Sequence, residues 1–167
     1  MSGFEVATVG DNCVDKFLPP VGLAAIGGNA RFAGSLGPQV VKVLDHVAAR
    51  SGPRVHEATA ADYSPRSHPA IADVHKRYYP GAPAISIRIT GDARDGRLLG
   101  AQLVGTRGAE ISKRVDTYAT ALHHGMTVAA MSDLDLSYTP PLGSPWDAVQ
   151  VATQAWERAA APVPSNA

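Results

Sequence analysis

Residues 84–105, AISIRITGDARDGRLLGAQLVG, predict a β-hairpin. In the first half, apolar and polar residues alternate, which is the two-residue period of a strand buried on one face. GDARDG supplies the residues of a turn, and a second alternating run follows it. The apolar residues are Ile85, Ile87 and Ile89 in the first strand and Leu99, Ala101 and Leu103 in the second. Two strands that share one apolar face need further elements to cover it.

A helix is predicted over residues 109–124, directly after the hairpin. Its apolar residues recur at helical spacing, and Glu110 can pair with Arg114 one turn later. Gly125 is suited to end the helix, because glycine tolerates the left-handed backbone that follows a last helical turn. The apolar stripe consists of Ile111, Val115, Tyr118, Ala119 and Leu122.

A second helix is predicted over residues 145–160. Ser144 caps it, Pro145 takes the first helical position, and Asp147 completes a capping box. Its buried side consists of Trp146, Val149, Ala152 and Trp156. The tail APVPSNA, residues 161–167, is expected to be disordered.

The segment before the hairpin is harder to assign. Residues 39–49 carry apolar side chains at helical spacing and also at strand spacing, so periodicity alone leaves both assignments open. Pro53 can start a short helix that runs to about residue 62. Strands followed by helices predict an α+β fold, with an antiparallel sheet and helices packed on one side.

Composition narrows the classes of function. A length of 167 residues fits one domain. Its 15 basic residues balance 15 acidic ones, so no excess of positive charge favours the binding of nucleic acid. The apolar runs fall short of the roughly 20 residues that span a bilayer, and the N-terminus lacks the order of a signal peptide. We therefore expect a cytoplasmic protein that binds neither nucleic acid nor membrane.

Motifs for self-contained chemistry are few. Cys13, the single cysteine, rules out an internal disulfide and a redox pair of cysteines within the chain. The six histidines lack a metal-binding spacing such as HExxH, so no metal site is predicted. GTRGAE, residues 105–110, either forms a tight turn or binds an anion at a helix N-terminus, and the turn is favoured.

Tyr138 has a distinctive setting, within SYTPPLGSPWD. It stands shortly before Pro140 and Pro141, which restrict the backbone and predict a stiff, extended segment. Two interpretations remain open: Tyr138 packs under the last helix, or it belongs to a contact surface, where tyrosine combines apolar area with a polar tip.

From about residue 31 to residue 158, the chain resembles the C-terminal dimerisation domain of the pyridine nucleotide-disulfide oxidoreductases. It looks most like the branch that contains the coenzyme A-disulfide reductases and related NADH oxidases. The matching stretches, in family order, are RFAGSLGPQVVKVLDHVAARSG, HKRYYPGAPAISIRITGD, GRLLGAQLVG, GAEISKRVDTYATALHHGMT and DLDLSYTPPLGSPWDAVQ. The resemblance implies the α+β fold of that domain and assigns residues 39–49 to a strand.

The first thirty residues resemble a different family. VATVGDNCVDKFLPP and GGNA look like the N-terminus of a ribokinase-like (PfkB-type) sugar kinase, without its nucleotide-binding half or its GAGD-like catalytic aspartate. In that family the sugar pocket would be bordered by Asp11, Asn12, Asp15, Gly28 and Asn29. We therefore expect a kinase-like stub over residues 1–30 that is no domain by itself, a dimerisation domain over 31–160, and a tail over 161–167.

The resemblance implies a module that forms a homodimer within a FAD-dependent, NAD(P)H-using disulfide reductase. In the coenzyme A-disulfide branch, tyrosines of this domain reach toward the partner's substrate site, and Tyr138 and Tyr79, of the pair Tyr78–Tyr79, are the positions that would carry this catalytic role. The family's flavin and NAD(P) domains precede the matching segment, so we expect this chain to bind neither cofactor and to be inactive alone. Two alternatives remain: a remnant of a PfkB-type sugar kinase fusion, or a subunit that acts with separately encoded reductase domains.

Overall fold

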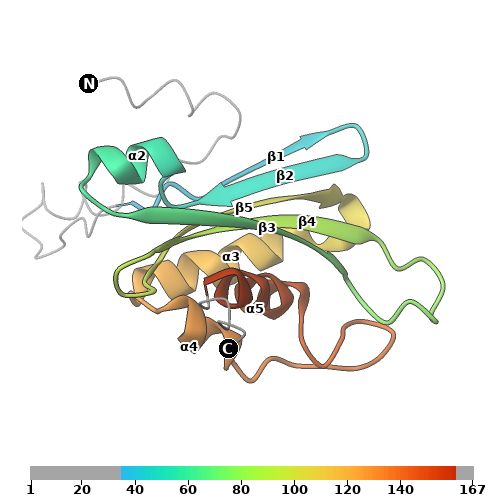
Figure 1. The fold of residues 1–167 in the computed structure, drawn as a ribbon. Coiled ribbons are helices and arrows are strands. Elements are labelled where there is room, and N and C mark those ends of the chain that lie inside the picture. The colour runs from blue at the N-terminus through green and yellow to red at the C-terminus, as the bar shows by residue number, and fades with distance from the viewer. Residues whose placement is uncertain (1–34, 161–167) are drawn as a thin grey trace, which may run out of the picture. The chain divides into compact units, whose positions relative to one another are not determined.

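The computed structural model describes residues 35–160 of the 167-residue chain (Figure 1). Within this range a five-stranded antiparallel sheet is covered by helices, which confirms the predicted α+β fold with helices packed on one side. The expected kinase-like stub over residues 1–30 and the expected tail over 161–167 lie outside the described residues, as do residues 31–34 at the start of the expected dimerisation domain.

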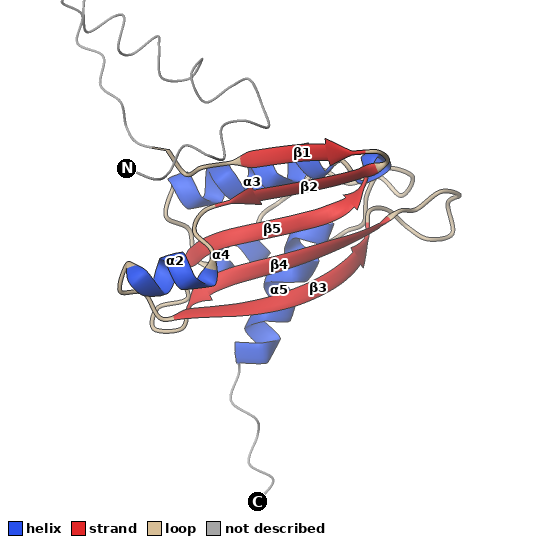
Figure 2. Ribbon diagram, turned by 90° about the horizontal axis from the view of Figure 1, so that it is seen from above, coloured by secondary structure: helices blue, strands red, loops and turns tan. Residues whose placement is uncertain are grey.

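Each strand of the sheet is antiparallel to its neighbours. The strands are β1 (Gln39–Val43), β2 (His46–Ser51), β3 (Pro65–Asp73), β4 (Ala84–Asp92) and β5 (Leu98–Thr106). Their order across the sheet is β1-β2-β5-β4-β3, which Figure 2 shows from the face opposite the long helices. Strand β5 is therefore central, and β1 and β3 are the edges.

The predicted hairpin is formed by β4 and β5. Ile87 lies opposite Leu103 and Ile89 opposite Ala101, and all four side chains are buried against the helices. Burying one isoleucine side chain stabilises a fold by about 2 kcal/mol, so this row contributes a large part of the core. The two-residue period of the sequence is confirmed.

The assignment of residues 39–49 to one strand is wrong. The segment forms two strands, β1 and β2, which pair from Gln39 opposite Arg50 to Val43 opposite His46. The chain reverses at Leu44, whose φ is 51° and whose side chain is 84% exposed. Tight turns that need positive φ are normally marked by glycine or asparagine, and leucine gave no such signal.

Three helices cover one face of the sheet: α3 (Ile111–His123), α4 (Val128–Ser132) and α5 (Ala148–Ala160). The short helix expected from Pro53 is α2 (Val55–Ala60), which lies at one end of the sheet on the other side (Figures 1 and 2). A 3₁₀ turn, η2 (Arg107–Ala109), leads into α3.

Helix α3 ends at His123, and the predicted terminating glycine, Gly125, follows it with a φ of 63°. The N–H of Met126 donates to the carbonyl of Ala121 (3.0 Å), and the N–H of Gly125 donates to that of Leu122 (3.1 Å). This pair of bonds is the Schellman arrangement, which satisfies the last carbonyls of a helix. The buried residues of α3 are Ile111, Arg114, Val115, Tyr118 and Ala121, so the predicted stripe is correct in part and omits an arginine.

Helix α5 begins at Ala148, not at Pro145 as predicted. Asp147 is its cap: Asp147 Oδ1 accepts the N–H of Val149 (2.9 Å), and Gln150 Oε1 accepts the N–H of Asp147 (3.1 Å). Pro145 and Trp146 thus remain in the preceding loop, and Trp146 is 58% exposed. Its predicted burial is wrong, whereas Val149, Ala152 and Trp156 are buried as expected.

Strand β3 is an edge strand that contains Pro65 and Pro69. It is held against α5 by Trp156, whose Nε1 donates to the carbonyl of Arg66 (2.8 Å) while the Arg66 guanidinium lies 4.1 Å from the ring centroid. Gly91 of β4 makes room for this ring, because a Cβ at that position would lie 2.6 Å from Trp156 Cζ2. Trp156 therefore joins the last helix to the edge strand, in addition to the other buried residues of α5.

Asp92 closes the turn between β4 and β5. Its side chain is 2% exposed, and its carboxylate accepts the backbone N–H of Arg94 (3.0 Å) and the Arg94 guanidinium (Nη2–Oδ2, 2.7 Å). These hydrogen bonds, the side-chain ones foremost, lower the pKa of Asp92 to about 2. Because the pKa in the folded state lies below that of the unfolded chain, the ionised carboxylate stabilises the fold above about pH 4. This contribution is lost as the pH falls through the folded-state pKa.

Replacing Asp92→Asn is expected to lower the melting temperature by several degrees near neutral pH, since the charge-assisted bonds to Arg94 are weakened. The difference between wild type and variant should shrink as the pH is lowered from about 5 to about 2, where the wild-type carboxylate also loses its charge. Thermal unfolding followed by circular dichroism measures this. Asp95→Asn, at an exposed position of the same turn, is the control. A difference that is the same at every pH would contradict the role of the carboxylate.

Candidate functional site

Tyr138 lies in the loop of residues 133–147, which joins α4 to α5 and is named here the Tyr138 loop. Its side chain is 45% exposed, and Leu142 in the same loop is 74% exposed. The carbonyl of Thr139 accepts the N–H groups of Leu142 (2.9 Å) and Gly143 (2.8 Å). The prolines at 140 and 141 therefore lie in a turn and do not continue an extended segment. Tyr138 is a surface residue and not part of the core under α5.

Tyr79 lies in the loop between β3 and β4, beside Tyr78. The two ring centroids are 5.1 Å apart, and Tyr78 is the more exposed of the two. An ion pair between Arg77 and Asp73 (2.9 Å) holds the start of this loop.

One backbone hydrogen bond joins the two tyrosine-bearing loops. The N–H of Lys76 donates to the carbonyl of Pro140, at 3.3 Å. The structure thus brings together the two segments that carry the predicted site residues Tyr138 and Tyr79. Within residues 35–160, their rings make no aromatic contact with each other.

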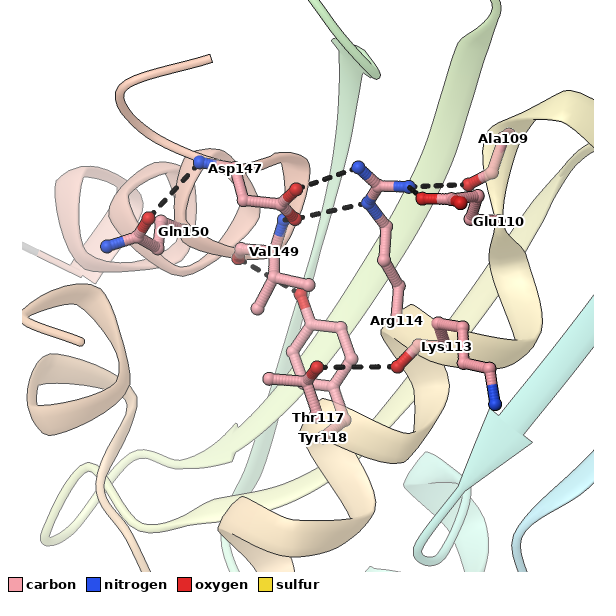
Figure 3. Close-up of polar contacts among 9 residues, drawn as sticks. All are labelled: Ala109, Glu110, Lys113, Arg114, Thr117, Tyr118, Asp147, Val149 and Gln150. Carbon is pink, nitrogen blue, oxygen red and sulfur yellow. Dashed lines mark hydrogen bonds and ion pairs between the residues drawn. The ribbon is translucent and has the colours of Figure 1, made fainter. Parts of the chain in front are cut away.

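Arg114 is a buried arginine, for which the sequence predicted only a pair with Glu110 on the same helix. Its guanidinium makes two bonds to the Asp147 carboxylate (Nη2–Oδ2, 2.7 Å; Nε–Oδ1, 3.1 Å) and one to the carbonyl of Ala109 (2.7 Å), as Figure 3 shows. The predicted pair with Glu110 is present at a longer distance, 3.8 Å. A two-bond arginine–carboxylate contact is strong and geometrically specific. It joins α3 to the end of the Tyr138 loop.

Tyr118 adds a second link between α3 and α5. It is fully buried, and its hydroxyl donates to the carbonyl of Val149 at 3.1 Å (Figure 3). Burial raises the pKa of Tyr118 well above its usual value, so the phenol keeps its proton. Its role is to hold the two helices together.

An apolar groove of about 380 Å³ lies between α3 and the start of the Tyr138 loop. Its apolar lining comes from Ala121, Met126, Leu134 and Leu136. The polar part of its wall is formed by Lys113, Asp116, Thr117 and Thr120 of α3. The groove is thus lined by the Tyr138 loop as far as Leu136, two residues before Tyr138.

The other candidate motifs contribute less. GTRGAE forms the end of β5, the 3₁₀ turn and Glu110, whose φ is 48°, in keeping with the tight turn. Among residues 35–160, no three histidine, cysteine, aspartate or glutamate side chains are grouped so that they could hold a metal ion. In the same range, no helix is long and apolar enough to cross a membrane.

Comparison with known proteins assigns this fold to one family. The model of the pyridine nucleotide-disulphide oxidoreductase dimerisation domain matches residues 39–149. Coenzyme A disulfide reductase of Staphylococcus haemolyticus is 32% identical over 123 residues, which cover 74% of this chain and 27% of that protein. The enzyme of the same name from Staphylococcus aureus (strain JH9) is 30% identical over 120 residues, covering 72% of this chain and 26% of its own length. The chain thus spans about a quarter of these curated relatives.

Solved structures show the same similarity. The NAD-dependent persulfide reductase from A. fulgidus superimposes with a TM-score of 0.78 at 31% identity, over 83% of this chain and 25% of that one. The reduced CoADR-RHD of Bacillus anthracis superimposes with a TM-score of 0.74 at 32% identity, over the same shares of the two chains.

Replacing Arg114→Met is expected to lower the free energy of unfolding by about 3 kcal/mol, because it leaves the partly buried Asp147 carboxylate without its partner. The double variant Arg114→Met/Asp147→Asn should recover part of this loss, since asparagine still caps α5 but carries no charge. Urea unfolding of both variants measures the effect. Arg158→Met, on the exposed side of α5, should be neutral. Equal stability of Arg114→Met and Arg158→Met would show that the pair is not needed.

Proposed function

Because the chain belongs to the pyridine nucleotide-disulphide oxidoreductase family through its dimerisation domain, we propose that it is the pairing module of a flavoprotein related to coenzyme A-disulfide reductase. One observation carries the proposal: the Tyr138 loop is fixed to α3 by Arg114 and Asp147, beside an apolar groove. A rigid aromatic segment next to an apolar surface loses little conformational entropy when a partner docks on it.

The proposed partner is a second copy of this chain, related by a two-fold axis. The proposed interface comprises the outer face of α3, the groove and residues 137–145. A two-fold contact uses the same patch on both copies, so a groove and an exposed leucine on one copy are each matched by the same features on the other. Leu142 has the exposure that such a contact would remove.

Tyr138 and Tyr79 are proposed to act on the partner's substrate site. Both phenols are partly exposed and lie in loops that are bound to each other. A phenol can donate a hydrogen bond to a substrate or transfer a proton to it. The catalytic role is thus assigned to residues that this chain presents to another subunit, and not to a pocket of its own.

FAD and NAD(P)H are proposed to bind parts of the reductase outside this chain, which is then not catalytic alone. Residues 31–160 are the proposed domain, with a kinase-like stub over 1–30 and a tail over 161–167. The cytoplasm is the proposed compartment, because a chain with the single cysteine Cys13 can form no internal disulfide and needs no oxidising surroundings.

Thr120→Arg is expected to weaken self-association by roughly tenfold or more, because it replaces a small side chain of the groove wall by a long one and adds a positive charge to that of Lys113. Sedimentation equilibrium over a range of concentrations measures the dimer. Ala60→Arg, an exposed position of α2 away from the proposed interface, is the matched control. A wild-type chain that stays monomeric at every concentration would refute the dimer. Equal dimerisation of Thr120→Arg would place the interface elsewhere.

The purified chain is expected to show no visible flavin absorption and to reduce no disulfide with NADH or NADPH. Flavin binding is tested by absorption spectra of the chain as purified, and again after FAD has been added and the unbound FAD removed by gel filtration. Disulfide reduction is tested by following the absorbance of NADH or NADPH. A stoichiometric flavin complex would contradict the proposal. Activity that emerges only on mixing with a separate flavin-containing chain would favour the alternative, a subunit that works with separately encoded reductase domains.

A further inference from the structure

One buried side chain, Gln150, closes the base of the Tyr138 loop. Its Nε2 donates to the carbonyls of Ser132 (3.0 Å) and Leu134 (2.7 Å), and its Oε1 accepts the N–H of Asp147 (3.1 Å). Ser132 is the last residue of α4, directly before the loop, and Asp147 is the last residue of the loop. A single amide group therefore binds both ends of the loop, and only 4% of the residue is exposed.

This pattern of bonds requires an amide. Glutamine offers two N–H donors and a carbonyl acceptor, and Gln150 uses both kinds of group. A carboxylate of the same shape has no donor for the two carbonyls, and an alkyl side chain has neither donor nor acceptor. The choice of side chain at this position therefore matters more than its size.

The amide is attached to a rigid support. Helix α5 is held on the sheet by Trp156 and is held to α3 by Asp147, which Arg114 binds. The middle of the loop is bound at Pro140 by the N–H of Lys76. Tyr138 lies between two fixed points of the backbone. On one side Gln150 binds the carbonyl of Leu134, and on the other side Lys76 binds the carbonyl of Pro140. Side chains hold a productive geometry when a second layer of bonds fixes the backbone that carries them.

We propose that Gln150 is a positioning residue for Tyr138: by binding both ends of the loop, it fixes where the phenol is presented to the second subunit. The part that concerns the second subunit rests on the proposed function, whereas the closure of the loop is a property of the single chain. The two can therefore be tested separately.

Two tryptophans report on the loop and on the core. Trp146 lies in the loop and is exposed, whereas Trp156 is buried against the sheet. Their indole N–H groups should therefore give two separate signals in a nitrogen-15 correlation spectrum. The signal that disappears in Trp146→Phe is that of Trp146. In Gln150→Leu, we expect the Trp146 signal to shift and its relaxation to show greater mobility, while the Trp156 signal stays in place. Gln154→Leu is the control, one turn later on α5, at a half-buried glutamine whose side chain makes no hydrogen bond within residues 35–160.

Gln150→Glu keeps an acceptor for the N–H of Asp147 but has no donor for the carbonyls of Ser132 and Leu134. This variant replaces Gln150→Leu in the test if the leucine variant does not fold. We expect it to mobilise Trp146 as well. A folded Gln150→Leu or Gln150→Glu variant whose Trp146 signal matches that of wild type would overturn the positioning role.

Self-association gives the second measurement. Gln150→Leu is expected to raise the dimer dissociation constant roughly tenfold, because the loop must then be ordered on binding. Tyr138→Ala combined with Gln150→Leu should add little to either single change, since both act on the same loop. A monomeric wild-type chain would refute the proposed dimer and still leave the Trp146 measurement to decide on Gln150. Fully additive effects of the two substitutions would overturn the link between Gln150 and Tyr138.

Discussion

A guanidinium in a protein interior must find acceptors for its N–H groups, because an unpaired buried charge destabilises a fold strongly. Arg114 finds them on the turn before its own helix and on Asp147 at the start of α5. Asp147 is both the partner of the arginine and the cap of α5, so one carboxylate decides where that helix begins and how it lies beside α3. The Arg114–Asp147 pair therefore fixes both the packing of α3 beside α5 on the sheet and the position of the end of the Tyr138 loop.

Local pattern was sufficient to predict the centre of the fold. Alternating isoleucines marked β4, and a glycine after an apolar stripe marked the end of α3, because both signals lie within one element. The turn at Leu44 could not be predicted, since its residue type does not favour positive φ. The start of α5 was misplaced for another reason: Ser144 and Asp147 can each cap a helix, and Arg114, 33 residues before Asp147, favours the second.

The candidate site was predictable only as separate pieces. An aromatic residue near prolines draws attention to Tyr138, and the family resemblance adds Tyr79, but their loops meet through the Lys76 N–H and a proline carbonyl. A hydrogen bond between two backbone groups can be formed by almost any pair of residues, so the residue types do not predict it. Gln150 was overlooked because a glutamine in an amphipathic helix resembles any solvent-facing polar residue until the carbonyls around it are known.

The prolines of β3 bear on how the domain behaves at high concentration. An exposed strand edge can pair with the edge of another molecule, and a sheet with two such edges can grow into a fibre. Proline has no N–H to offer, so Pro65 and Pro69 make β3 a poor template. Strand β1, at the other side of the sheet, carries no proline. If two copies pair antiparallel through β1, their outer edges are both proline-bearing, and this form of growth stops at two molecules.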